Sequence, residues 1–124
     1  MNWTMAGALW GLLGVGLGAF GAHGLKAVAS EQGLAWWETA ARYQIYHGLA
    51  LIAAGWVADR WPGSLANAAA WCFLIGVVLF SGSLYALTLS GVRALGAITP
   101  IGGVAFLAGW GCLALAARRE DVKT

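Results

Sequence analysis

No charged residue occurs in residues 61–92, which read WPGSLANAAAWCFLIGVVLFSGSLYALTLSGV. A helix needs about 20 apolar residues to cross roughly 30 Å of hydrocarbon, so this stretch is long enough to span a membrane. A short soluble chain does not have enough polar residues to shield such a segment from water. In a membrane, the surrounding lipid shields it. The stretch therefore predicts a transmembrane helix at about residues 65–90.

Three further charge-poor stretches extend this pattern over the whole chain. Nothing charged precedes Lys26, and residues 43–58 and 94–117 contain no charged side chain. The second stretch is short, but Arg42 can keep its stem in lipid while its charged end reaches the interface. We therefore expect a single membrane domain over residues 1–124, with spans at about 3–22, 34–58, 65–90 and 95–117. The predicted fold is all-α, a compact bundle of four transmembrane helices.

Composition agrees with a membrane protein and excludes some partners. The chain is 60% hydrophobic and 10% charged, whereas soluble proteins average about 25% charged residues. A formal net charge of +2 is too small and too dispersed for binding nucleic acid. We expect the lipid bilayer, and no nucleic acid, as a partner.

The basic residues predict an orientation. With four spans, both termini and the second loop share one side of the membrane. That side carries Arg60, Arg118, Arg119 and Lys123, and the other carries Lys26, Arg42 and Arg93. An excess of lysine and arginine marks the cytoplasmic side, so four against three favours cytoplasmic termini.

Glycines form a stripe along the first span, and small residues form another along the fourth. At 100° per residue, the first stripe falls within about 80° of one helix face. Small residues at such spacing let two helix backbones approach closely in lipid. The stripe predicts a helix-packing face, either within the chain or between copies in a homo-oligomer. Its members are Gly7, Gly11, Gly14, Gly18 and Gly21.

Polar side chains inside the spans gather toward the first and third loops. Polar groups in a bilayer need partners, so these should face inward. One hypothesis is that they hydrogen-bond helix to helix. The other is that they line a pocket for a lipid, a quinone or a larger membrane complex. The candidate ligand-binding residues are His23, Tyr43, Gln44, His47, Ser81, Tyr85 and Thr99.

Other functions find less support in the sequence. His23 and His47, placed at similar depth, could ligate a haem or metal, but Glu38 is the one candidate third ligand, so we expect no metal and no cofactor. A small transporter or channel would need an oligomer, and the charge-free stretches contain no carboxylate for proton coupling. No serine-histidine-acid set, Walker loop, Rossmann loop or zinc-protease helix occurs, so we expect no enzyme and no catalytic residues.

Five segments, in order along nearly the whole chain, resemble a known family. They are residues 18–25 (GAFGAHGL), 37–40 (WETA), 43–47 (YQIYH), 79–85 (LFSGSLY) and 98–103 (ITPIGG). The chain is similar in these segments to domain-of-unknown-function family 423, the YgdD-type small inner-membrane proteins of bacteria, with a mitochondrial relative called transmembrane protein 256. The resemblance implies four spans in a bacterial inner membrane. It implies no established activity and no catalytic residues.

Overall fold

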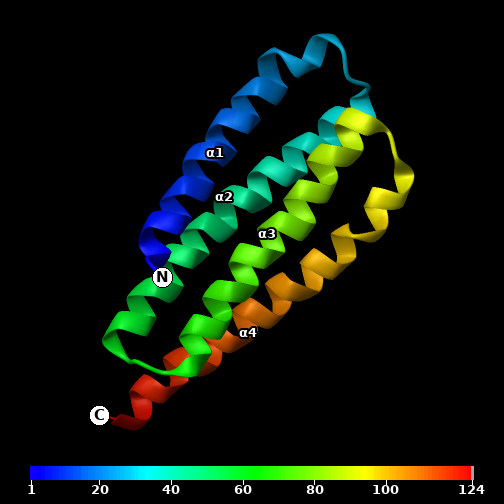
Figure 1. Cartoon of the computed structure of the whole chain (residues 1–124). Coiled ribbons are helices and arrows are strands. Elements are labelled where there is room, and N and C mark those ends of the chain that lie inside the picture. Colours follow the sequence, from blue (N-terminus) through cyan, green and yellow to red (C-terminus); the bar gives the residue numbers. More distant parts are fainter. Residues whose placement is uncertain (124) are drawn as a thin grey trace.

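The computed structural model describes the backbone of residues 1–123 and the side chains of residues 1–118. The described chain contains four long helices and two short 3₁₀ segments (Figure 1). The helices are α1 (Trp3–His23), α2 (Glu31–Arg60), α3 (Ser64–Ser90) and α4 (Thr99–Lys123), and the 3₁₀ segments are η1 (Leu25–Ala27) and η2 (Arg93–Ala97). The all-α fold is confirmed. The side chains of Arg119 and Lys123, which count in the charge bias, lie outside the described residues.

Local sequence explains where the helices begin and end. α2 begins earlier than the expected span because the Ser30 hydroxyl accepts a hydrogen bond of 3.0 Å from the Gly33 amide and so caps the helix. α3 ends at Ser90 and is capped by Gly91, whose φ of 72° lies in the left-handed region that glycine adopts freely. The chain then forms η2, so α4 begins at Thr99 rather than near residue 95. Pro100 lies in its first turn, where the missing amide donor costs little.

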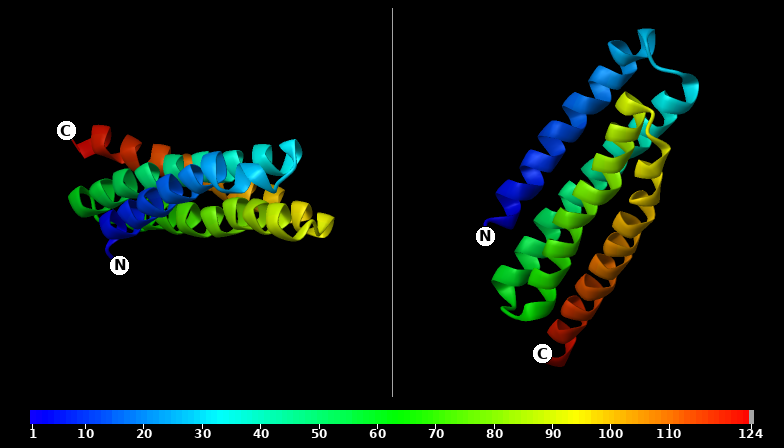
Figure 2. Two further views of the ribbon diagram at one scale, coloured as in Figure 1. Left: turned by 90° about the horizontal axis from the view of Figure 1, so that it is seen from above. Right: turned by 45° about the vertical axis from the view of Figure 1, so that its right-hand side comes forward.

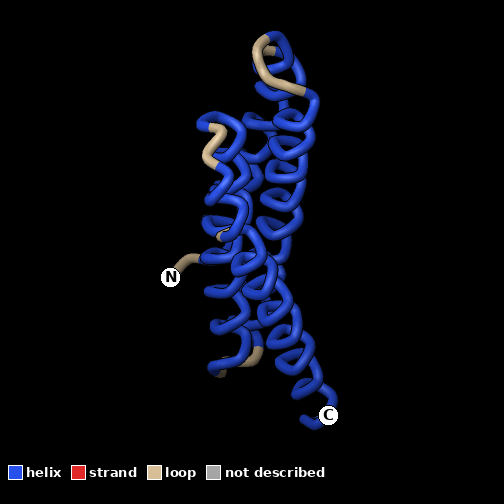
Figure 3. The backbone as a smooth tube through the Cα atoms, turned by 90° about the vertical axis from the view of Figure 1, so that its right-hand side faces the viewer, coloured by secondary structure: helices blue, strands red, loops and turns tan. Residues whose placement is uncertain are grey.

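The helices run antiparallel to their neighbours in chain order (Figure 1). α2 and α3 pack against each other along their length, α1 packs on α2, and α4 packs on α3 (Figure 2). α1 also reaches α3 near the N-terminus, where the Trp3 indole donates to Asn67 Oδ1 at 2.9 Å. Within residues 1–123, irregular backbone is confined to the first two residues and the short connections (Figure 3). Such an arrangement satisfies the backbone inside each helix, as hydrocarbon requires.

Close approach of α1 and α2 depends on glycines spaced seven residues apart. A Cβ added at Gly7 would collide with the Gly48 carbonyl oxygen, and one at Gly14 would lie 2.7 Å from Ile45 Cγ1. At Gly21 it would lie 2.9 Å from the Trp37 indole nitrogen.

The other two glycines of the predicted stripe are placed differently. A Cβ at Gly18 would make ordinary contact, 3.6 Å from Ala41, and one at Gly11 would meet nothing within 4 Å. The seam therefore runs through Gly7, Gly14 and Gly21, while Gly11 lies at its open edge. The glycine face of α1 is filled by α2 of the same chain.

α3 and α4 use phenylalanines against glycines. A Cβ at Gly109 would lie 2.6 Å from the Phe73 ring, and one at Gly102 would lie 2.8 Å from the Cα of Phe80. A Cβ at Gly76 would lie 2.5 Å from the Phe106 ring. The rings of Phe73 and Phe106 and the backbone of Phe80 thus occupy space that only a missing side chain leaves, which fixes the antiparallel register of the two helices.

Among the described residues, three helical segments are long and apolar enough to cross a membrane: Trp3–Ala27, Ser64–Ser90 and Arg93–Arg118. Their outward faces are apolar, with side chains such as Leu12, Val104 and Leu107 exposed by 68%, 65% and 74%. A soluble monomer rarely exposes so much contiguous apolar surface. α2 is longer than these segments but more polar, because Gln44, His47 and several charged residues lie within it.

Candidate functional site

Gln44 joins three helices at the centre of the polar cluster. Its Nε2 donates to the Trp10 carbonyl on α1 at 3.1 Å, and its Oε1 accepts a hydrogen bond from the Tyr85 hydroxyl on α3 at 2.7 Å. The Gln44 side chain is buried. Both ends of its amide are therefore used inside the chain.

His47 has both ring nitrogens occupied. Nδ1 lies 2.7 Å from the Tyr43 carbonyl oxygen, which can only accept, so Nδ1 carries the proton. Nε2 then accepts from the Trp110 indole N–H at 3.1 Å. The imidazole also stacks on Phe106, with ring centroids 3.6 Å apart. His47 is thus a neutral imidazole that ties α2 to α4.

The predicted hydroxyl residues also contact neighbouring helices. Ser81 donates to the Ala40 carbonyl on α2 at 2.7 Å, and its side chain is fully buried. The Thr99 hydroxyl lies 2.6 Å from that of Ser83, joining α4 to α3. Because Ser83 donates to the Phe80 carbonyl at 2.9 Å, Thr99 is the donor of this pair.

Two predicted residues take no part in these bridges. Tyr43 packs its half-buried ring against Phe80, with centroids 4.8 Å apart. His23 is exposed at the end of α1. Gly21 lies against Trp37, so His23 and His47 differ in depth by at least ten residues of α2. At 1.5 Å per residue this is about 15 Å, and the prediction that they share a depth is wrong.

The distance between the histidines excludes joint ligation of one iron or metal ion. Among the residues whose side chains are described, no group of three or more histidine, cysteine, aspartate or glutamate side chains is placed to hold a metal. The geometry favours helix association for Gln44, His47, Ser81 and Tyr85. Of the seven candidate ligand residues, Thr99 alone lines either of the two cavities described below.

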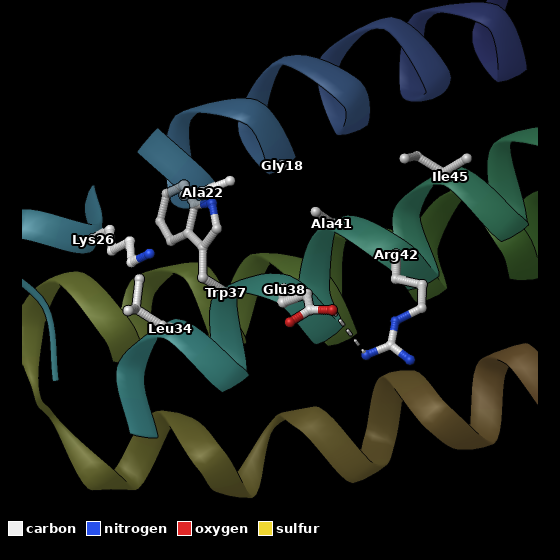
Figure 4. A pocket seen from close by; sticks show the side chains of 10 residues that line it. Gly18, Ala22, Lys26, Leu34, Trp37, Glu38, Ala41, Arg42 and Ile45 are labelled. Atoms are coloured by element: carbon white, nitrogen blue, oxygen red, sulfur yellow. Dashed lines mark ion pairs between the residues drawn. The ribbon is translucent and has the colours of Figure 1, made fainter. Parts of the chain in front are cut away.

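The first cavity is a groove of about 550 Å³ between α1 and the first half of α2 (Figure 4). Its apolar wall combines small residues of α1 with larger side chains of α2. Lys26, Glu38 and Arg42 add three charges at its rim (Figure 4). The lining residues are Gly18, Gly21, Ala22, Lys26, Leu34, Trp37, Glu38, Ala41, Arg42 and Ile45.

Charge and shape divide the groove between polar and apolar parts. Arg42 and Glu38 form a loose ion pair, with 3.8 Å between Nη2 and Oε1, and their side chains stay 49% and 77% exposed. Such a pair holds little energy and leaves most donors and acceptors free for another molecule. Trp37 forms the wall and is fixed by its N–H, which donates to the Leu17 carbonyl at 2.7 Å. The arrangement fits an amphipathic molecule with a charged head.

The sequence alone does not predict the groove, although the charged residues that line it can be read from the sequence. Glu38 and Arg42 stand four residues apart, so they face the same side of a helix. Lys26 lies on η1, however, and its place in the lining of the same groove follows from the fold (Figure 4). The sequence feature that indicates such a site is a pair of opposite charges beside a tryptophan on one helix, together with a neighbouring helix whose facing residues are glycine and alanine.

Comparisons with known proteins agree with the membrane fold. The family described as protein of unknown function DUF423 matches residues 17–103. A UPF0382 membrane protein of Staphylococcus haemolyticus is 52% identical over 104 residues, covering 84% of each chain. The UPF0382 membrane protein YwdK of Bacillus subtilis is 46% identical over 112 residues, covering 90% of this chain and 91% of that protein. No solved structure matches the chain. The chain therefore belongs to the DUF423 family of unknown function, whose bacterial relatives include UPF0382 membrane proteins.

Proposed function

We propose that the chain is a four-span protein of the bacterial inner membrane that binds a phospholipid in the groove between α1 and α2. The observation that carries this proposal is the groove itself, with Lys26, Glu38 and Arg42 at the rim of an apolar cavity of about 550 Å³. That volume lies within the usual range of about 300–1,000 Å³ for ligand sites. Both termini lie on the cytoplasmic side in this proposal.

A membrane-spanning α2 is supported by its length and its neighbours. Its 30 residues correspond to a helix of about 45 Å, longer than the roughly 30 Å hydrocarbon core. It lies antiparallel between α1 and α3 (Figure 1), both of which are apolar enough to cross. Its most polar buried side chains, Gln44 and His47, have hydrogen-bond partners on other helices. Their polarity therefore does not oppose insertion.

The charges of the groove match a head group that contains both a phosphate and an amine. A guanidinium binds phosphate oxygens through paired N–H donors, so Arg42 is suited to the phosphodiester, with Lys26 as a second cation. The Glu38 carboxylate, 3.8 Å from Arg42, is placed to accept from an ammonium group. Phosphatidylethanolamine carries both groups. Its acyl chains would follow Trp37 and Ile45 into the bilayer.

Native mass spectrometry of the delipidated protein tests the proposal by titration with phosphatidylethanolamine. Arg42→Gln should weaken the affinity for this lipid about fivefold, as expected from losing roughly 1 kcal/mol of attraction for one cation. The control is Arg60→Gln at the other end of α2, where the guanidinium lies 5.0 Å from the Trp56 ring centroid. Equal occupancy in Arg42→Gln and Arg60→Gln would refute the groove as the binding site.

No specific observation favours transport through one chain. Gln44, His47, Ser81 and Tyr85 are paired within the bundle. Among the described side chains, the Trp10 indole nitrogen is the one buried polar atom without a partner. A single donor does not make a polar pathway.

A further inference from the structure

A second cavity lies on the opposite side of α2 from the groove. It has a volume of about 640 Å³, is open to the outside, and is lined by the start of α2, α3, η2 and the start of α4. Consecutive tryptophans of α2 line different cavities: Trp36 lines the second and Trp37 lines the first. Neighbouring residues on a helix point about 100° apart, which explains how one segment serves both cavities.

The second cavity differs from the groove in charge. Arg93 of η2 lines it, and none of its lining residues is acidic. Its other polar side chains are neutral, namely Gln32 and Thr99, and Phe80 and Leu84 form an apolar wall. In the groove, by contrast, the carboxylate of Glu38 stands beside the cations.

The backbone places Arg93 at the end of the bundle. Gly91 ends α3 in the left-handed conformation, and Arg93 begins η2 two residues later. Trp36, across the cavity, lies near the start of α2 at the same end (Figure 1). Tryptophan and arginine are the side chains that anchor at lipid head groups.

We propose that the second cavity binds an anionic phospholipid, with Arg93 holding the phosphate and the first part of one acyl chain lying against Phe80 and Leu84. A cavity lined by a cation and by no acidic residue favours a head group with net negative charge over a zwitterion. The volume exceeds that of a phosphate alone and accommodates the glycerol and upper acyl chain. This site shares no lining residue with the groove, so either assignment can fail while the other stands.

Lipid titration of the full-length protein, read by native mass spectrometry, tests this site. The probes are phosphatidylglycerol, phosphatidylethanolamine and phosphatidylcholine with identical acyl chains. Wild type should bind phosphatidylglycerol more tightly than phosphatidylcholine, and Arg93→Gln should weaken phosphatidylglycerol binding about fivefold. Arg93→Lys keeps the charge but loses the paired donors, so its affinity should fall between the two.

Arg60→Gln is the matched control because Arg60 lines neither cavity. It should leave the phosphatidylglycerol preference unchanged. Circular dichroism of each variant confirms its helical fold, and Arg93 is exposed, so its substitution leaves the core intact. Equal binding of phosphatidylglycerol and phosphatidylcholine, unchanged binding by Arg93→Gln, or equal losses in Arg93→Gln and Arg60→Gln would each overturn the assignment.

Discussion

The Tyr85 hydroxyl on α3 donates a hydrogen bond of 2.7 Å to the side-chain oxygen of Gln44 on α2. Through its amide nitrogen, Gln44 also holds the Trp10 carbonyl of α1 at 3.1 Å. One glutamine thus ties the first three helices together. This use of polar side chains inside the bundle leaves the charged residues at its end as the candidates for ligand binding.

Removing the Tyr85 hydroxyl should weaken the fold and leave lipid binding intact. Hydrogen bonds between membrane helices contribute about 0.6 kcal/mol on average, with a maximum near 1.7. Tyr85→Phe should lower the free energy of unfolding by an amount in this range, measured by steric trapping in bicelles. Tyr46→Phe is the control, because Tyr46 is 49% exposed. If Tyr85→Phe weakens phosphatidylethanolamine binding and leaves the free energy of unfolding unchanged, Tyr85 does not act in helix association.

Two glycines of α1 should respond differently to the same substitution. Gly7→Ala adds a methyl group that meets the Gly48 carbonyl oxygen, whereas Gly11→Ala adds one that meets nothing within 4 Å. Gly7→Ala should cost about 1–3 kcal/mol, because α1 must move away from α2. Gly11→Ala should change stability by less than about 0.5 kcal/mol. Equal effects in a thermal unfolding series would show that the seam is placed wrongly.

His47 and Trp110 should be energetically coupled. His47→Phe keeps a ring to stack on Phe106 but removes the acceptor of the Trp110 indole N–H. Trp110→Phe removes the donor instead. In a double-mutant cycle, the loss of stability in the double variant should be smaller than the sum of the two single losses by about 1 kcal/mol. Additive losses would show that the 3.1 Å contact contributes nothing to stability.

Membrane topology can be read from single cysteines in a background with Cys72→Ser and Cys112→Ser. Cysteines replacing Lys26 and Val92 should be labelled from one side by a membrane-impermeant maleimide. Cysteines replacing Asn2 and Gly63 should be labelled from the other side, because four antiparallel spans alternate. Labelling of positions 26 and 63 from the same side would show that α2 does not cross the membrane.

Much of the fold could be predicted from sequence because its causes are local. Residues 61–92 carry no charge, and Ser30 has the N-cap chemistry that starts α2. The seven-residue spacing of Gly7, Gly14 and Gly21 likewise marks one helix face. Gly11 falls within the same broad stripe, so the pattern groups it with them. The open space beside its Cβ position depends on where α2 lies, which the pattern of α1 alone does not contain.

The candidate site depended on contacts between distant residues. Helical periodicity places Gln44 and His47 near each other, but their partners follow from the antiparallel register set where Gly7 meets Gly48. The groove likewise exists because small residues of α1, including Gly21 and Ala22, lie opposite Trp37. Neither relationship can be read from the residues of a single helix.

Photo-crosslinking in proteoliposomes tests whether the α1–α2 groove binds phospholipid. The probe is phosphatidylethanolamine with a diazirine on the acyl chain near the glycerol, and crosslinked peptides are identified by mass spectrometry. We expect crosslinks to concentrate on residues 18–26 and 34–45, and unlabelled phosphatidylethanolamine to compete for them. Crosslinks spread evenly over outward-facing residues such as Leu12 and Leu107 would contradict binding in the groove.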